Sequence, residues 1–205
     1  MAAFALPDQR ATWVMAGDSI TQGVYHTHLS RSWVEHVHER VRWQLDRLGD
    51  SIINSGVSGW TAPKILGDFE YLVARFDPDI VSLSLGTNDA NAGADGLDTF
   101  RDSMTALIEC SQRLGAQVIL HTPVLATAGA SRALALPLYA AVVRDLADET
   151  DTVLVDHEKY WLQHFDGLEP IPWMDDHSHP NAVGHVHMAN LTLRTLELGE
   201  LEDRP

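Results

Sequence analysis

The stretch TWVMAGDSIT, residues 12–21, joins a short apolar run to a glycine and then to an aspartate and a serine. Residues 12–17 predict a buried β-strand, because a strand that is covered on both faces reads as a continuous apolar run. Gly17 permits a sharp turn, which would place Asp18 and Ser19 at the start of a helix. Both residue types are favoured helix caps, and a serine is also a nucleophile where a base lies within hydrogen-bond reach. This stretch alone leaves the two roles open.

Short apolar runs followed by longer amphipathic segments recur along the rest of the chain. Further strands are predicted at residues 51–56, 79–86, 116–123 and 152–156. Helices are predicted at residues 31–48, 62–75, 97–114, 135–149 and 181–198. Strand–helix alternation of this kind predicts an α/β fold, with a mostly parallel sheet and helices on both of its faces. The 205 residues are enough for one substantial core, so we expect a single domain over residues 1–205.

The composition excludes several classes of partner. The formal net charge of −15 disfavours nucleic acid, because phosphate binding requires a basic face. No stretch approaches the ~18 apolar residues that a membrane-spanning helix needs, so we expect no membrane partner. The N-terminal MAAFALPDQR has no basic segment followed by a long apolar run, which predicts a cytoplasmic protein without a secretory signal.

Four polar blocks lie where the predicted strands and helices meet. Three of them follow strands, namely GDSIT (17–21), NSGVSGWT (54–61) and GTNDA (86–90). The fourth, DDHSHPNAVGH (175–185), comes just before the last helix. Ligands of open α/β sheets bind beyond the carboxyl ends of the strands, so the four blocks are expected to meet at one site.

The side chains within these blocks are of the types that a nucleophilic hydrolase uses. Asn88 follows a strand, where an asparagine either satisfies the turn or donates an N–H to a developing oxyanion. Asp176 and His179 are three residues apart in a turn, a spacing at which a carboxylate and an imidazole can touch. Ser58 is a rival nucleophile, since its pentapeptide GVSGW resembles a G-x-S-x-G elbow, but a tryptophan occupies the last glycine position.

A metal site is the alternative for the same cluster of acidic residues and histidines. His177 and His179 form an H-x-H pair, and Asp175 or Asp176 would supply a further ligand. A hydrolytic metal site needs at least three ligands and an oriented water, and this arrangement would leave Ser19 without a function. The sequence therefore favours a site without a metal ion or cofactor.

In this order, GDSIT, NSGVSGWT, GTND and DHSHPN resemble the four blocks of the SGNH (GDSL-type) hydrolases. The resemblance extends from residue 17 to residue 185. It implies a three-layer α/β/α sandwich around a five-stranded parallel sheet of the flavodoxin-like type. It also implies a serine esterase that acts through an acyl-enzyme intermediate and needs no cofactor.

The family motifs imply a role for each matching residue. Ser19 resembles the nucleophile, His179 the general base and Asp176 the residue that orients His179. The implied oxyanion hole consists of the backbone N–H groups of Ser19 and Gly59 together with the side chain of Asn88.

The segments near the predicted strand ends are short, polar and aromatic. They hold no aliphatic run that would line a groove for a long acyl chain, in which each buried CH₂ would contribute ~0.8 kcal/mol. We therefore expect a small ester substrate with a short acyl group, such as acetyl, on a carbohydrate or another polar alcohol. Residues expected to contact the substrate are Asp18, Tyr25, Trp60 and Trp173. The alternative is a lipase-like, lysophospholipase-like or aryl esterase.

Overall fold

The computed structural model describes residues 3–201, and a parallel β-sheet lies at its centre. The five strands are β1 (Thr12–Gly17), β2 (Ser51–Asn54), β3 (Ile80–Ser84), β4 (Gln117–His121) and β5 (Val153–Val155). They are ordered β2-β1-β3-β4-β5, and every neighbouring pair is parallel. The predicted α/β class and five-stranded parallel sheet are confirmed.

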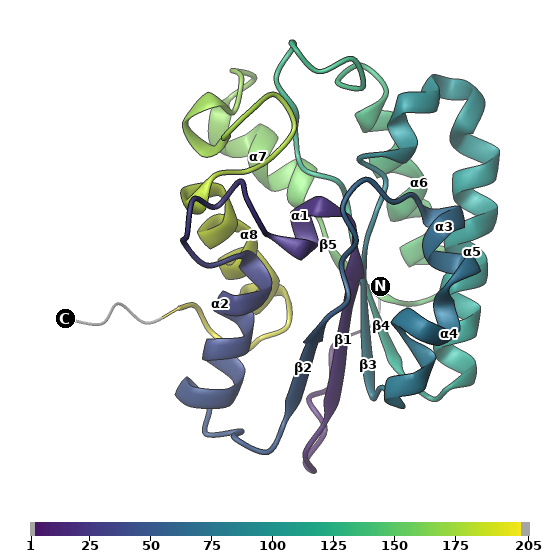
Figure 1. Cartoon of the computed structure of the whole chain (residues 1–205), viewed down its shortest axis with the longest axis vertical. Helices are drawn as coiled ribbons and strands as arrows, with labels where there is room; N and C mark the ends of the chain where they lie inside the picture. The colour runs from purple at the N-terminus through teal and green to yellow at the C-terminus, as the bar shows by residue number, and fades with distance from the viewer. Residues whose placement is uncertain (1–2, 202–205) are drawn as a thin grey trace.

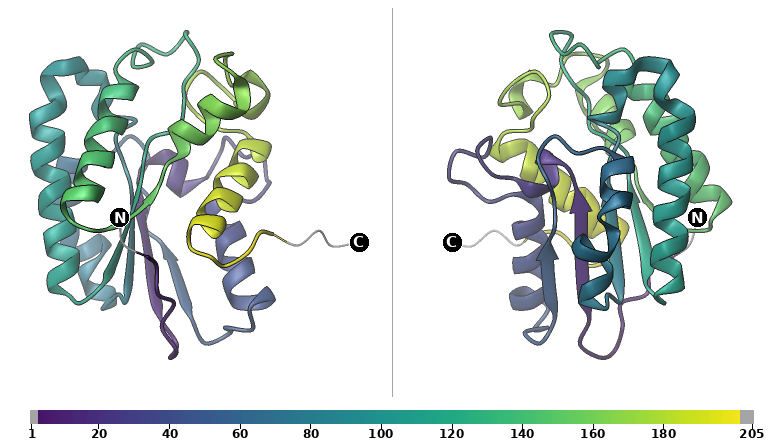
Figure 2. Two further views of the ribbon diagram at one scale, coloured as in Figure 1. Left: turned by 180° about the vertical axis from the view of Figure 1, so that it is seen from behind. Right: turned by 45° about the vertical axis from the view of Figure 1, so that its right-hand side comes forward.

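Helices cover both faces of the sheet (Figure 1). One face carries α2 (Trp33–Glu39), α7 (His157–Phe165) and α8 (Ala182–Thr195). The other face carries α3 (Ala62–Gly67), α4 (Phe69–Leu72), α5 (Leu97–Arg113) and α6 (Leu136–Glu149). Turned views keep α5 beside α6 and α2 beside α8, on opposite sides of the strands (Figure 2). This is the three-layer α/β/α sandwich expected from the sequence.

Several shorter helical elements complete the fold. They are the α-helix α1 (Ser19–Gln22), the π-helix η1 (Arg40–Gln44) and the 3₁₀ helices η2 (Ala74–Phe76), η3 (Asp89–Gly96) and η4 (Ile171–Trp173). Within residues 3–201, no helix combines the length and the apolar character that crossing a membrane requires.

Strand β1 illustrates why the strands are apolar at every position. Trp13 and Met15 face the layer of α2 and α8, whereas Val14 and Ala16 face the layer of α3 and α5. All four side chains are fully buried. Because successive side chains of a strand point to opposite faces, a strand between two helical layers needs apolar residues on both.

Two predicted helices are shorter or more broken than their apolar spacing indicated. The helix expected over residues 31–48 ends with η1, just before Asp46, whose φ of 55° is left-handed. The helix expected over residues 62–75 breaks at Asp68 into α3 and α4. In both places the backbone leaves the helical region at an aspartate, a residue that favours turns over helix interiors.

One helix, α7, was not predicted. It begins after Asp156, whose carboxylate accepts a hydrogen bond from the Lys159 N–H at 3.1 Å, as a helix N-cap does. Its sequence, HEKYWLQHF, is mainly polar and aromatic, so few apolar positions carry its helical period. Trp161 is fully buried and packs α7 onto the sheet.

A buried carboxylate holds the amino end of the sheet. Asp50 is 3% exposed and accepts hydrogen bonds from the Ala11 N–H at 3.1 Å and from the Trp13 indole N–H at 3.2 Å. The guanidinium of Arg47 donates to the same carboxylate at 2.8 Å. Asp50 therefore fixes the start of β1 against the loop that leads into β2.

Replacing Asp50 with alanine is expected to lower the free energy of unfolding by about 2–4 kcal/mol, because three donors lose their acceptor. Urea denaturation followed by circular dichroism measures this change. Asp102→Ala is the matched control, because Asp102 is exposed on α5 and its loss should change stability by less than about 0.5 kcal/mol. An Asp50→Ala protein as stable as this control would contradict the role assigned to the carboxylate.

Candidate active site

A continuous line of hydrogen bonds joins three residues at the carboxyl edge of the sheet. Ser19 is the first residue of α1, and its hydroxyl oxygen lies 3.0 Å from Nε2 of His179. The other ring nitrogen of His179, Nδ1, lies 3.0 Å and 2.9 Å from the two carboxylate oxygens of Asp176. The structure therefore brings together the three residues for which the sequence suggested the roles of nucleophile, base and orienting acid.

The turn that presents Ser19 is built around Asp18. The Asp18 carboxylate accepts a hydrogen bond from the Ile20 N–H at 2.9 Å, which makes Asp18 the N-cap of α1. Burial raises the pKa of Asp18 to about 7, although the Ile20 N–H opposes this shift. The side chain is only 2% exposed, so the predicted contact between Asp18 and substrate is corrected to a capping role.

The loop that carries Asp176 and His179 is closed by its own backbone and by the start of α8. Met174 and Pro180 form an isolated antiparallel bridge across it. Asn181 then caps α8, since its side-chain oxygen accepts hydrogen bonds from the N–H groups of Val183 at 2.9 Å and Gly184 at 3.1 Å. Its amide nitrogen donates to two carbonyls of the preceding loop. The last polar block therefore fixes its own geometry.

The electrostatics of the loop favour a neutral base beside an ionised acid. Burial opposes ionisation of Asp176, but hydrogen bonds from the Ser178 N–H and the His179 ring outweigh it and bring the Asp176 pKa to about 2. Burial lowers the pKa of His179, and Asp176 reverses this shift only in part. At neutral pH the pair is a carboxylate and a neutral imidazole, the state in which Nε2 can accept a proton.

The glycine block contacts α1 and leaves one backbone donor available. The Gly56 N–H donates to the Asn54 side chain at 3.0 Å, and Asn54 in turn donates to the Thr21 carbonyl at 2.7 Å. Gly59 has a left-handed φ of 76°, and its N–H has no hydrogen-bond partner within residues 3–201. Of the two glycines, Gly59 is the one whose N–H is available to a ligand.

Asn88 follows β3 and is held in one orientation by a residue that the sequence did not indicate. Arg132 donates from Nη1 to the Asn88 side-chain oxygen at 2.9 Å and to the Thr87 carbonyl at 3.1 Å. The Asn88 amide nitrogen donates to the Trp60 carbonyl at 3.0 Å, which leaves its second N–H for a ligand. Arg132 lies in the loop between β4 and α6, outside every polar block, and no sequence pattern singles it out.

Asp89 joins the glycine block to the turn that carries Asn88. Its carboxylate accepts hydrogen bonds from the Ala62 N–H at 2.9 Å and from the Gly86 N–H at 3.2 Å. Burial raises the pKa of Asp89, and these two hydrogen bonds act against the shift. The loops that carry Gly59 and Asn88 are therefore held together by one buried side chain.

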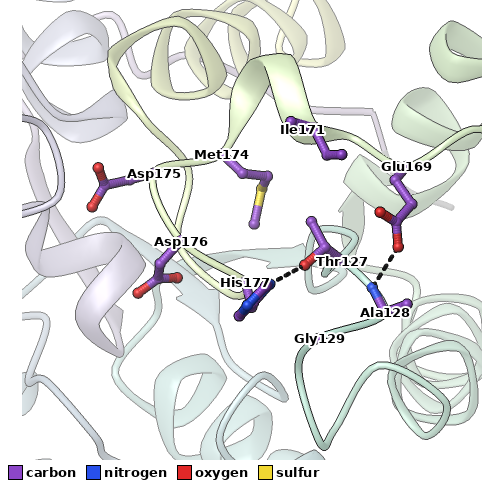
Figure 3. Close-up of a pocket in the computed structure, with 9 residues that line it drawn as sticks. All are labelled: Thr127, Ala128, Gly129, Glu169, Ile171, Met174, Asp175, Asp176 and His177. Carbon is purple, nitrogen blue, oxygen red and sulfur yellow. Dashed lines mark hydrogen bonds between the residues drawn. The ribbon is translucent and has the colours of Figure 1, made fainter.

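The neighbours of Asp176 in the last block have other partners. Nδ1 of His177 lies 2.7 Å from the Thr127 hydroxyl, on the wall of a pocket of about 500 Å³ (Figure 3). Asp175 turns to the other side of the loop and contacts His26 at 2.8 Å and His28 at 2.5 Å. The structure does not bring the side chain of His177 into the hydrogen-bond line.

The residues that could hold a metal ion differ from the H-x-H pair that the sequence suggested. In the described chain, His26, Asp176 and His179 offer ligand atoms that all lie within 4.8 Å of one another. Two of these side chains already bond to each other in the line to Ser19. A metal ion at this position would therefore compete with that line.

The other residues predicted to contact the substrate differ in exposure. Tyr25 is 79% exposed and packs edge-on against His26. Trp60 is half-buried, and its ring packs against the core beside α3. Trp173 is 4% exposed and stacks on His187 in the layer of α7 and α8. Trp173 therefore has no surface for a sugar ring, and the prediction is corrected to core packing.

Two pockets lie beside residues of the site, one beside Asp176 and one beside Asn88. The pocket beside Asp176 has a volume of about 500 Å³, and its wall includes Glu169. The pocket beside Asn88 has a volume of about 520 Å³, and its wall includes Asp89 and Asp95. Carboxylates thus line both pockets.

Known proteins share both the sequence pattern and the fold. An acetylxylan esterase from Geobacillus stearothermophilus is 27% identical over 160 residues, which cover 73% of each chain. The crystal structure of Axe2, an acetylxylan esterase from the same organism, matches 95% of this chain and 97% of its own, with a TM-score of 0.81 and 24% identity. The crystal structure of LAE5, an α/β hydrolase enzyme from the metagenome of Lake Arreo, Spain, matches 99% of both chains, with a TM-score of 0.81 and 20% identity.

The family assignment rests on the sequence over most of the chain. Residues 15–186 match the GDSL-like Lipase/Acylhydrolase family, and this range contains all four polar blocks. The chain therefore belongs to the GDSL-like Lipase/Acylhydrolase family of ester hydrolases, the SGNH hydrolases that its motifs resemble.

Proposed function

We propose that this protein is a serine ester hydrolase in which Ser19 is the nucleophile, His179 the general base and Asp176 the residue that orients His179. The observation that carries this proposal is the unbroken line of contacts, 3.0 Å from Ser19 to the imidazole and 2.9 Å from the imidazole to the carboxylate. A serine hydroxyl is a weak nucleophile at neutral pH, so it needs a base within this distance.

Acylation begins when the Ser19 oxygen attacks the ester carbonyl carbon while Nε2 of His179 takes the hydroxyl proton. The resulting oxyanion accepts hydrogen bonds from the N–H groups of Ser19 and Gly59 and from the Asn88 side chain. Asp176 stabilises the imidazolium that has formed. The ester C–O bond then breaks, and the imidazolium gives its proton to the departing alcohol oxygen.

Deacylation repeats these steps with water. His179 takes a proton from the water as the water oxygen attacks the acyl carbon, and the same donors hold the second oxyanion. When the bond from the acyl carbon to Ser19 breaks, the imidazolium returns a proton to the serine oxygen. The acid leaves, and the hydrogen-bond line is restored.

The substrate class that we propose is a short acyl ester, preferably acetyl, of a carbohydrate. The relative that is 27% identical is an acetylxylan esterase, which supports this class. Glu169 and Asp176 place carboxylates on the wall of the pocket, and the Glu169 carboxylate can accept a hydrogen bond from a sugar hydroxyl. The same carboxylates would repel the phosphate of a lysophospholipid. An uncharged alcohol with several hydroxyls therefore fits this pocket better than an anionic lipid.

Exposed apolar side chains on nearby loops favour a second candidate, a lipase-like or aryl esterase. Val24 and Leu29 are exposed in loop 23–32, and Leu168 and Ile171 are exposed after α7. Exposed apolar groups of this kind can bind an acyl chain or an aromatic alcohol. The dependence of the rate on acyl length distinguishes the two candidates.

Ser19→Ala is expected to lower kcat for p-nitrophenyl acetate by about 10⁴-fold or more, because the other two groups of the line act only through the serine. Circular dichroism should show an unchanged fold, since the residue lies in a turn at the end of β1. Ser58→Ala is the matched control, because Ser58 is exposed and has no hydrogen bond to a histidine in the described chain. If Ser58→Ala lost activity while Ser19→Ala retained it, Ser58 would be the nucleophile and the assignment of Ser19 would be wrong.

Asn88→Ala is expected to lower kcat by roughly 10²–10³ with little change in KM, because the amide acts on the charge of the transition state. Steady-state kinetics on p-nitrophenyl acetate measure both constants. Asn91→Ala serves as the control, since Asn91 is an exposed amide of the same turn that bonds to the Asn88 carbonyl. A rise in KM alone would show that Asn88 is an ordinary substrate contact.

The enzyme is expected to hydrolyse short acyl esters fastest, so kcat/KM should decrease from p-nitrophenyl acetate through butyrate to octanoate. Acetylated xylo-oligosaccharides are expected to release acetate. Initial rates on the three esters and acetate assays on the oligosaccharide test both parts, with Ser19→Ala as the blank. A rise in kcat/KM through octanoate, with no acetate from the oligosaccharide, would support the lipase-like candidate instead.

A further inference from the structure

A second imidazole lies flat against the proposed base. The ring of His26 stacks on the ring of His179 with their centroids 3.7 Å apart and their planes within 3° of parallel. His26 is half-buried and comes from loop 23–32, which follows α1. The reaction steps given above assign no role to this ring.

Asp175 fixes the second imidazole. Nδ1 of His26 lies 2.8 Å from one carboxylate oxygen of Asp175, and Nε2 of His28 lies 2.5 Å from the other. These two hydrogen bonds lower the pKa of Asp175, so its carboxylate is ionised. His26 and Asp175 thus form an imidazole–carboxylate pair that lies against the pair of His179 and Asp176.

The loop adopts an unfavourable backbone while it makes this contact. Tyr25, His28 and Leu29 have left-handed φ values of 84°, 47° and 70°. Residues other than glycine rarely adopt this backbone region, and each residue that does so destabilises the loop. Leu29 is exposed, whereas Tyr25 packs edge-on against His26. The bonds of the two histidines to Asp175 help to hold this backbone, together with the hydrogen bonds of the Thr27 hydroxyl to the Gly23 carbonyl at 3.1 Å and of the Ser30 N–H to the Thr27 carbonyl at 2.9 Å.

The stack restricts the motion that would disable the base. His179 must keep Nε2 on Ser19 and Nδ1 on Asp176 at once, and a displacement of about 1 Å in such a group can cost ~10²-fold in rate. A flat ring at 3.7 Å blocks rotation of the imidazole toward that side.

The second ring also acts on the pKa of the base. Burial is the largest cause that lowers the pKa of His179, and His26 and Arg132 add to it, whereas Asp176 acts in the opposite direction. His26 therefore favours the neutral form of His179, which is the form that can accept the serine proton.

We propose that His26 is a positioning residue for His179, holding its imidazole in line between Ser19 and Asp176. This inference rests on the proposed function of Ser19 and His179. Asp175 is the residue that anchors His26.

Several charged and titratable side chains surround the two rings. They include Tyr25, Asp175, Asp176, His28, Arg132 and His185. Both aspartates have low pKa values, and an arginine keeps its charge. His185 stays neutral, because burial lowers its pKa to about 3.

The test compares His26→Phe, which keeps a flat ring, with His26→Gln, which does not. The plateau of kcat/KM on p-nitrophenyl acetate at higher pH should stay within about threefold of wild type in His26→Phe and fall about tenfold in His26→Gln. The acidic limb should move up in both variants, because His26 is one of the causes that lower the pKa of His179. His38→Gln, on α2 and bonded to Arg42, is the control with a wild-type profile. A plateau in His26→Gln equal to that of wild type would overturn the proposal.

A second measurement separates this proposal from the esterase assignment. The pKa of His179 is determined by NMR titration of its imidazole in Ser19→Ala, with and without His26→Phe, so that no turnover is needed. The pKa is expected to be higher in the double variant, and an unchanged value would overturn the role of His26. A wild-type protein that hydrolyses no ester would reject the proposed function but would leave this pKa comparison intact. If His26→Gln does not fold, the His26→Phe results decide.

Discussion

The hydrogen bond between Ser19 and His179 joins residues 160 positions apart, and it depends on the sheet being parallel throughout. In a parallel sheet every strand ends at the same edge, so the polar turns after β1, β2 and β3 meet there. The pairing of Gly17 with Ser84 sets the turns of Ser19 and Asn88 at the same level. A slip of one residue between these strands would reverse the faces of their side chains and separate the two turns.

The turns at this edge are fixed to one another before any substrate arrives. Each connection is made by a side chain of one segment that bonds to the backbone of another. Asn54 donates to the Thr21 carbonyl at 2.7 Å, Asp89 accepts from the Ala62 N–H at 2.9 Å, and Arg132 donates to a carbonyl beside Asn88 at 3.1 Å. Donors that are held in place need no reorganisation when the oxyanion forms, which is the condition under which such groups are most effective.

The sequence located the strands and the polar blocks because both leave local signals. A continuous apolar run marks a strand that is buried on both faces, and a glycine with polar neighbours marks its end. Arg132 and His26 leave no such signal, since each acts by contact with a residue that is far away in the chain. Trp173 was predicted to contact the substrate, because a tryptophan in a polar segment can line a binding site as well as pack in a core. Its stack on His187, a tertiary contact, distinguishes the two. Local chemistry therefore predicted what each block contains, and tertiary contacts decided which neighbours support it.

Asp18 shows how the turn that presents Ser19 affects the stability of the whole chain. Burial raises its pKa to about 7, so between about pH 4 and pH 7 the folded chain holds a proton that the unfolded chain has released. The unfolded state binds fewer protons in this range, and stability therefore falls as the pH rises through it. An ionised carboxylate beside the proposed nucleophile would oppose an oxyanion, whereas a protonated Asp18 would not. Arg132, which lowers the pKa of Asp18, supplies a positive charge that offsets the ionised form. The buried turn thus limits negative charge near the proposed oxyanion hole, and it does so by making ionisation of its own cap unfavourable to folding.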